Sequence, residues 1–113
     1  MIPFEININK EGSGFEANFP LLKFTDEYSM LQELNRCDAD YIIEEVLPNL
    51  DKVLAGDLVT YEFGYDATLI NFYSNKTIVS YNDGDDALEV DSEDVYNFMR
   101  AWCERLVEWE NQL

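Results

Sequence analysis

The feature that most constrains the fold is an apolar stripe near the C-terminus. Asp91 or Ser92 is suited to cap a helix, and Glu93 and Asp94 supply acidic residues for its first turn. Apolar residues then recur at intervals of three and four: Val95, Phe98, Met99, Trp102, Leu106 and Trp109. This spacing puts them on one face of an α-helix, and we expect that face to pack against a sheet.

A strand meander is expected to provide that sheet. Val59, Tyr61 and Phe63 alternate with other residues in the first run, Gly64-Tyr65-Asp66 ends it, and later runs are rich in β-branched and aromatic residues. Short turns favour antiparallel pairing in chain order. The strands are predicted at 58–63, 68–73 and 77–81, with a short edge strand at 87–90.

The N-terminal residues predict a hairpin. Residues 4–9 and 15–19 alternate apolar and polar side chains around a turn that contains Gly12 and Gly14. Pro20 should end the second strand, because proline cannot donate to a ladder.

Helices are expected between Asp26 and Ala55. Thr25 fits an N-cap, Pro48 should kink or split the second helical run, and Gly56 fits the position after a helix end. The apolar face of that run comprises Ile42, Ile43, Val46, Leu47, Leu50, Val53 and Leu54. The fold class is therefore α+β: one domain, 1–113, with an antiparallel sheet (meander plus N-terminal hairpin) and helices packed on one face.

Charge restricts the possible partners. The chain has 24 acidic and 7 basic residues and a formal net charge of -17, yet 47% of its residues are hydrophobic, which argues against disorder. Nucleic acid and anionic membranes bind surfaces with clustered Lys and Arg, so neither is an expected ligand. The excess acid is either a well-solvated surface or a field that steers a basic partner.

The residues provide little catalytic equipment. The chain has no histidine, no glycine-rich phosphate loop, and two isolated cysteines without zinc spacing, Cys37 and Cys103. No acid pair stands out for glycoside hydrolysis, and residues 83–89 break the EF-hand register because Gly84 directly follows Asp83. We expect no enzyme, no cofactor and no metal.

The start of the chain, Met1-Ile2-Pro3-Phe4-Glu5, lacks the basic segment and apolar run of a signal peptide. No apolar stretch approaches the roughly 20 residues of a membrane span. The expected location is cytoplasmic, where Cys37 and Cys103 should be buried free thiols.

Acidic residues crowd one part of the chain. Seven carboxylates fall within twelve residues: Asp83, Asp85, Asp86, Glu89, Asp91, Glu93 and Asp94. This pattern predicts a docking surface for a basic protein, whose encounter such charge would speed. The predicted contacts are Asp83, Asp85, Asp86 and Glu89, then Glu62 and Asp66, with Tyr65 or Tyr81 as an aromatic anchor.

From Leu47 onward the chain resembles a known class of protein. The residues concerned are Leu50-Asp51-Lys52-Val53-Leu54-Ala55-Gly56, Tyr61-Glu62-Phe63, Thr77-Ile78, Asp91-Ser92-Glu93-Asp94 and the helix of Trp102. This stretch, about two-thirds of the chain, resembles the immunity proteins of bacterial contact-dependent growth inhibition and related polymorphic toxin systems. The resemblance implies a cytoplasmic protein that binds a delivered toxin domain and blocks its active site or substrate surface.

The leading hypothesis is therefore a non-enzymatic inhibitor of a basic, RNA- or tRNA-cleaving nuclease toxin, with carboxylates in place of the substrate's phosphates. The first alternative is an acidic nucleic-acid mimic or adaptor that binds a host nucleic-acid-binding protein. An acid-pair hydrolase or a calcium-binding module is the second.

Overall fold

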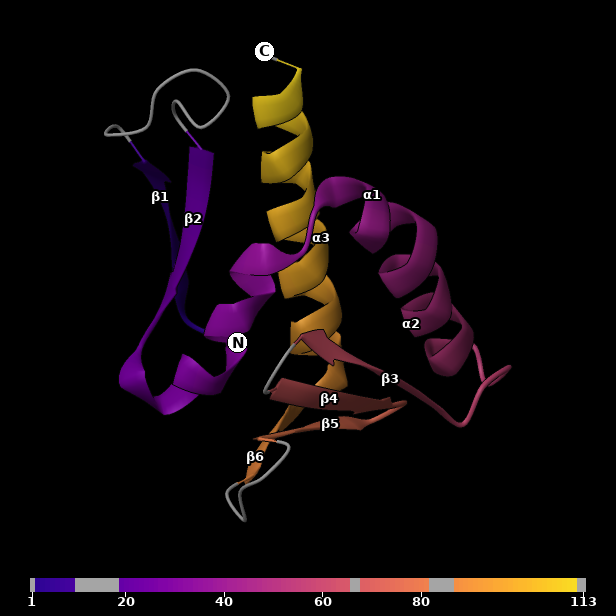
Figure 1. Ribbon diagram of the computed structural model, residues 1–113. Coiled ribbons are helices and arrows are strands. Elements are labelled where there is room, and N and C mark those ends of the chain that lie inside the picture. Colours follow the sequence, from indigo (N-terminus) through magenta and orange to yellow (C-terminus); the bar gives the residue numbers. More distant parts are fainter. Residues whose placement is uncertain (1, 10–18, 66–67, 82–86, 112–113) are drawn as a thin grey trace.

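Along the chain, a pair of strands is followed by a group of helical segments, and four further strands are followed by one long helix (Figure 1). The computed structural model describes residues 2–9, 19–65, 68–81 and 87–111. Its strands are β1 (Phe4–Asn9), β2 (Phe19–Phe24), β3 (Thr60–Tyr65), β4 (Thr68–Tyr73), β5 (Lys76–Tyr81) and β6 (Ala87–Asp91). Its helical segments are η2 (Asp26–Arg36), α1 (Ala39–Tyr41), η3 (Ile42–Val46), α2 (Leu47–Leu54) and α3 (Ser92–Glu110).

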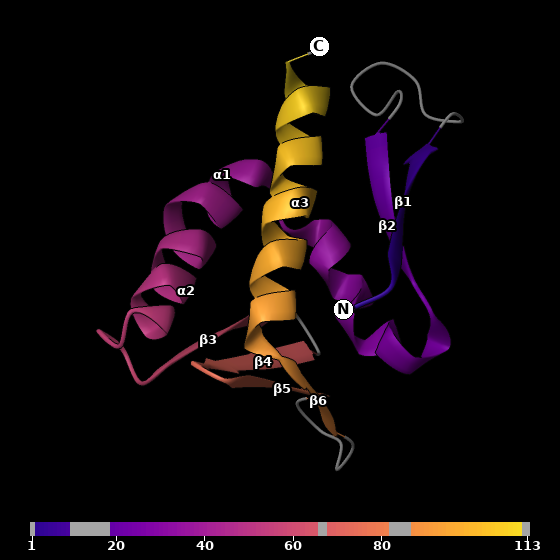
Figure 2. The same ribbon diagram turned by 180° about the vertical axis from the view of Figure 1, so that it is seen from behind.

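The meander forms a four-stranded antiparallel sheet in the order β3-β4-β5-β6, as the sequence predicts. Phe63, Ile70 and Val79 are paired across neighbouring strands and are all buried. Figures 1 and 2 show the helices together on that side of the sheet. The α+β class, with helices on one face of the meander, is thus confirmed.

The N-terminal hairpin is a separate two-stranded sheet of β1 and β2. β2 runs from Phe19 to Phe24, so the prediction that Pro20 ends a strand is wrong. Pro20 is paired with Ile8, and each strand of a two-stranded sheet has a free edge where proline's missing N–H needs no partner. Residues 15–18 of the predicted strand lie outside the described residues.

The helix after Thr25 is a 3-10 helix, η2, with a kink at Tyr28. Thr25 occupies the N-cap position, but its side chain makes no capping hydrogen bond. The next helix has a cap that sequence reasoning missed, since a carboxylate oxygen of Asp38 accepts a hydrogen bond from the Tyr41 N–H at 2.7 Å.

Pro48 lies in the first turn of α2, and the form of the helical run changes just before it. Immediately before α2 the backbone takes the wider π-helical form, in which the Leu47 N–H donates to the Ile42 carbonyl. A π-turn before a proline accommodates its ring and its missing donor. The Asn49 side chain, in the same turn, donates to the Glu45 carbonyl at 2.6 Å.

Only part of the predicted apolar face of this region is buried. Ile42, Val46, Leu50 and Val53 are completely buried, whereas Ile43 and Leu54 are exposed. The broad apolar face predicted from sequence is therefore wrong at its two margins.

Gly56 ends α2 as predicted, with a φ of 87°. The Gly56 N–H donates to the Val53 carbonyl, and the Asp57 N–H donates to the Lys52 carbonyl at 2.8 Å. This pair of hydrogen bonds is a Schellman motif, which fixes the direction in which the chain leaves the helix.

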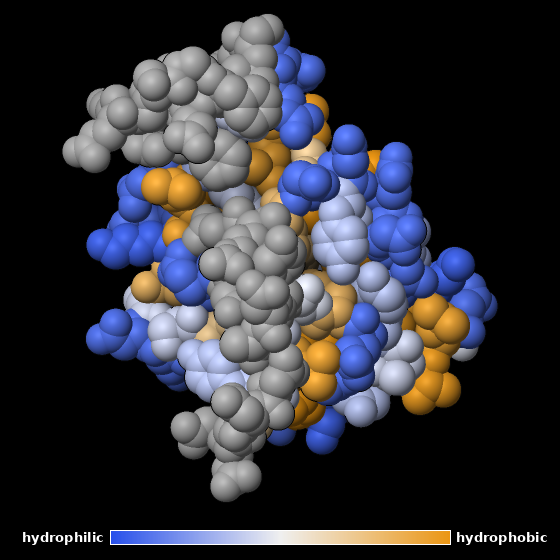
Figure 3. Space-filling model, viewed as in Figure 1, coloured by the Kyte–Doolittle hydropathy of each residue, from blue (hydrophilic) through white to orange (hydrophobic). Residues whose placement is uncertain are grey.

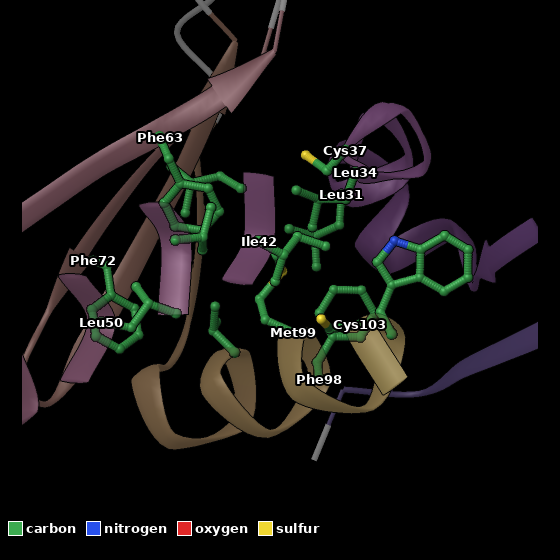
Figure 4. Packing of buried hydrophobic residues seen from close by; sticks show 14 of the residues in the cluster. Leu31, Leu34, Cys37, Ile42, Leu50, Phe63, Phe72, Phe98, Met99 and Cys103 are labelled. Atoms are coloured by element: carbon green, nitrogen blue, oxygen red, sulfur yellow. The ribbon is translucent and has the colours of Figure 1, made fainter. Parts of the chain in front are cut away.

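The core lies between α3, the sheet and the preceding helices (Figure 4). Side chains from the sheet (Phe63, Phe72) face those of η3 and α2 (Ile42, Leu50), with Met99 of α3 beside them. Every residue of the predicted α3 stripe is buried: Val95, Phe98, Met99, Trp102, Leu106 and Trp109. The helix predicted most directly from sequence is thus confirmed together with its buried face.

A buried pair of hydroxyl groups joins α3 to the sheet. The Thr77 Oγ1 and Ser92 Oγ atoms lie 2.8 Å apart, and the Ser92 hydroxyl also donates to the Tyr73 carbonyl. Asp91, not Ser92, takes the N-cap position, without a side-chain capping bond. Ser92 therefore serves the core, and its two partners remove the cost of burying it.

Candidate acidic docking surface

The side of the meander away from the helices carries one continuous row of paired residues. Glu62 pairs with Asn71, Asn71 with Ile78, and Ile78 with Glu89. Paired residues of an antiparallel sheet point to the same face, and Glu62 and Glu89 are both exposed. Two predicted contact residues thus share one row at opposite margins of the sheet, about 14 Å apart at the usual strand spacing.

The centre of this outer face is partly apolar. Leu69 and Ile78 are half-buried and Tyr73 is exposed, and all three lie on the face of Glu62 and Glu89 by their register. Apolar side chains framed by charged ones are the usual anatomy of a protein–protein interface.

The next row of the same face contains a basic residue. Lys76 is paired with Asp91, so that carboxylate has an opposite charge directly across the strands. Glu62 and Glu89 are opposite Asn71 and Ile78, which carry no charge. The uncompensated negative field of the outer face therefore comes from its two marginal glutamates.

A second acidic feature lies beside the edge strand β6. A hollow of about 250 Å³ is lined by the carboxylate residues Glu89, Asp91 and Asp94, together with Ile2, Tyr28 and Val90. Its acids continue the charge of the outer face around the sheet edge. Within the described ranges, no group of three or more His, Cys, Asp or Glu residues is arranged to hold a metal ion.

The other predicted contacts are not brought to this face. Tyr81 is 37% exposed at the end of β5, but it pairs with the buried Thr68 and so belongs to the helix side of the sheet. Tyr65 ends β3, and its side chain lies outside the described part of the structure. Four predicted contacts also lie outside it: Asp66, Asp83, Asp85 and Asp86.

An exposed apolar patch follows α2, and sequence reasoning missed it. We call Leu54, Leu58 and Val59 the connection patch; their side chains are 41%, 38% and 84% exposed. Figure 3 shows hydrophobic residues gathered at the right-hand edge of the molecule, over the α2–β3 connection. The predicted strand at 58–63 is wrong in its first two residues, because β3 begins at Thr60. The alternation of Val59 with Tyr61 and Phe63 suggested a strand residue facing the core.

A polar cluster ties the π-helical region to β3. The Tyr41 and Tyr61 hydroxyls are neighbours, and the Asn49 side chain lies beside Tyr61. Burial, followed by the neighbouring Tyr41, raises the pKa of Tyr61 to about 12. Burial also raises the pKa of Tyr41. Both phenols therefore remain neutral at physiological pH and hold β3 against the helices.

Cys37 and Cys103 are both free thiols in the core, as expected from sequence. Burial, reinforced by the adjacent Asp38 carboxylate, raises the pKa of Cys37 to about 11. Burial also raises the pKa of Cys103, with smaller contributions from Glu104 and Glu110. Both thiols are therefore protonated and poorly nucleophilic at neutral pH.

This pKa predicts slow alkylation of Cys37 in the folded protein. With a pKa near 11 instead of 9.0, the thiolate fraction at pH 8 is about a hundredfold lower than in the unfolded chain. Iodoacetamide labelling followed by peptide mass spectrometry should show at least this difference between native and urea-unfolded protein. The native rate should rise about tenfold per pH unit up to pH 11. Equal native and unfolded rates at pH 8 would contradict the assignment.

Among the described residues, no helix combines the length and the apolar composition needed to cross a membrane. Comparison with known proteins finds no matching family model, no matching curated sequence and no matching solved structure. The functional argument therefore rests on the surface just described.

Proposed function

We propose that this protein is a non-enzymatic inhibitor that binds a basic nuclease toxin in the cytoplasm. The observation that carries the proposal is the outer face of the meander, which no described helix or strand covers and which has Glu62 and Glu89 at its two margins. A net charge of -17 over the whole chain makes a positively charged protein the partner with the most favourable encounter.

Inhibition would follow from what a nuclease must present to its substrate. An enzyme that cuts RNA holds phosphates with Lys and Arg side chains. Carboxylates of the outer face would pair with those cations and occupy the substrate surface, while Ile78, Leu69 and Tyr73 exclude water at the centre. The charged margins would then set encounter rate and register, and the apolar centre would slow dissociation.

Capture from the cells of origin tests this proposal. A tagged form of the protein should retain a basic partner that is released at high salt and, once separated, cleaves RNA. The matched bait carries Glu62→Gln, Glu89→Gln and Asp91→Asn and should retain much less of it. A retained partner without nuclease activity that binds nucleic acid would instead support the mimic or adaptor alternative.

A further inference from the structure

The two edges of the meander differ in how they are protected. β3 is the first strand in the sheet order, so among the described residues only β4 pairs with it. Its six residues include neither Lys nor Pro, which commonly protect sheet edges from pairing. The opposite edge, β6, is shorter and borders the acidic hollow lined by Ile2 and Tyr28. β3 is therefore the edge better suited to accept another strand.

One hydrogen bond shows which backbone groups of β3 are available. The Thr60 Oγ1 donates to the Phe72 carbonyl at 2.9 Å, so that carbonyl is directed toward β3. Phe72 and its partner Tyr61 are then a hydrogen-bonded pair of the antiparallel ladder. Because such pairs alternate, Thr60 and Glu62 turn their N–H and C=O groups outward, along the free edge.

The connection patch leads directly into this edge. Val59 precedes Thr60, and at 84% exposure it is the most exposed large hydrophobic side chain of the described residues. The Schellman motif around Gly56 fixes the chain just before it. A rigid apolar patch beside unpaired strand groups offers a partner both side-chain contact and backbone hydrogen bonds.

We propose that an extended segment of the basic partner adds a strand to the free edge of β3, with an apolar side chain on the connection patch. Charge selects this occupant: Glu62 lies on the edge and favours lysine or arginine in the added strand. A second copy of the chain is disfavoured, because each copy carries a net charge of -17. The inference rests on the proposed function and specifies how the partner docks.

The test uses a defined probe, a short end-blocked peptide of alternating lysine and valine. Its control is the same peptide with an N-methyl group on every backbone nitrogen, which keeps the charge and removes the donors of both edges. The protein variants are Glu62→Pro, which removes the outward N–H, and Glu62→Gln, which removes only the charge. Ala87→Pro is the matched control, since the same alternation directs the Ala87 N–H outward from β6 and Ala87 carries no charge.

Affinity is measured by fluorescence anisotropy at low and high salt, and amide hydrogen exchange locates the contact. Glu62→Pro should weaken binding about tenfold beyond the effect of Glu62→Gln, while Ala87→Pro changes it less than about threefold. The N-methylated peptide should bind the wild type as weakly as the unmethylated peptide binds the Glu62→Pro variant. The Thr60 and Glu62 amides should become protected in the complex.

Equal binding of the methylated and unmethylated peptides would overturn strand addition, and this comparison needs no folded variant. Binding that is salt-sensitive, weakened by Glu62→Gln and indifferent to backbone methylation would remove strand addition and keep acidic docking. Absence of binding to the wild type at low salt would count against both.

Discussion

Replacing Trp102 with alanine should lower the free energy of unfolding by about 3–5 kcal/mol. The Trp102 side chain is completely buried midway along α3, where the helix meets the rest of the core. Truncation removes most of an indole ring from a closely packed region and leaves a cavity that its neighbours fill only in part. Urea unfolding followed by far-ultraviolet circular dichroism measures the change, since that signal does not depend on tryptophan.

The matched control is Trp102→Phe. The indole Nε1–H is buried and has no hydrogen-bond partner among the described residues, so phenylalanine removes an unsatisfied donor while it leaves a smaller cavity. Its cost should be clearly below that of alanine. A Trp102→Ala protein whose unfolding midpoint hardly moves would mean that this face of α3 does not form the core.

Removing the carboxylates of the outer face should slow association with the basic partner by about tenfold or more at low salt. The variant combines Glu62→Gln, Glu89→Gln and Asp91→Asn, whose side chains are all exposed. Electrostatic steering raises association rates by about 10–1000-fold, so loss of the local field is large enough to measure. Exposed charges are screened over about 3 Å at 1 M salt, where the difference should disappear.

A charge-matched variant separates the local field from the total charge. Glu44→Gln, Glu104→Gln and Glu110→Gln remove three exposed carboxylates from the helices instead of the sheet. Stopped-flow kinetics at low and high salt should show a much smaller effect for this variant. Equal slowing by both variants would mean that the outer face has no particular role. The acids Asp83, Asp85 and Asp86, predicted from sequence as contacts, form a further triple for the same measurement.

The regular elements could be predicted because their signals are local. The apolar stripe of α3 and the alternation of apolar residues in β4 and β5 indicate which side chains are buried. Gly56 indicates a backbone conformation of positive φ that other residues rarely adopt. The ends of elements depended on tertiary context instead. Pro20 is tolerated in β2 because the strand has a free edge, and Val59 is exposed because β3 begins one residue later.

The candidate site was predictable in part. Excess charge in the sequence indicated Glu62 and Glu89 as contact residues, but only the register of three strand pairs places them in one row. The same register moves Tyr81 to the opposite face from these glutamates. The apolar centre of Leu69, Ile78 and Tyr73 was missed, because alternation along a strand does not tell which face the helices cover.

The most direct test of the proposed function is a titration of the captured partner's RNA cleavage. The partner, separated from the protein at high salt, is returned to physiological salt with labelled RNA and increasing amounts of wild type or of the Glu62→Gln, Glu89→Gln, Asp91→Asn variant. Wild type should abolish cleavage at one equivalent, and the variant should need a large excess. Undiminished cleavage at a large excess of wild type would contradict the account.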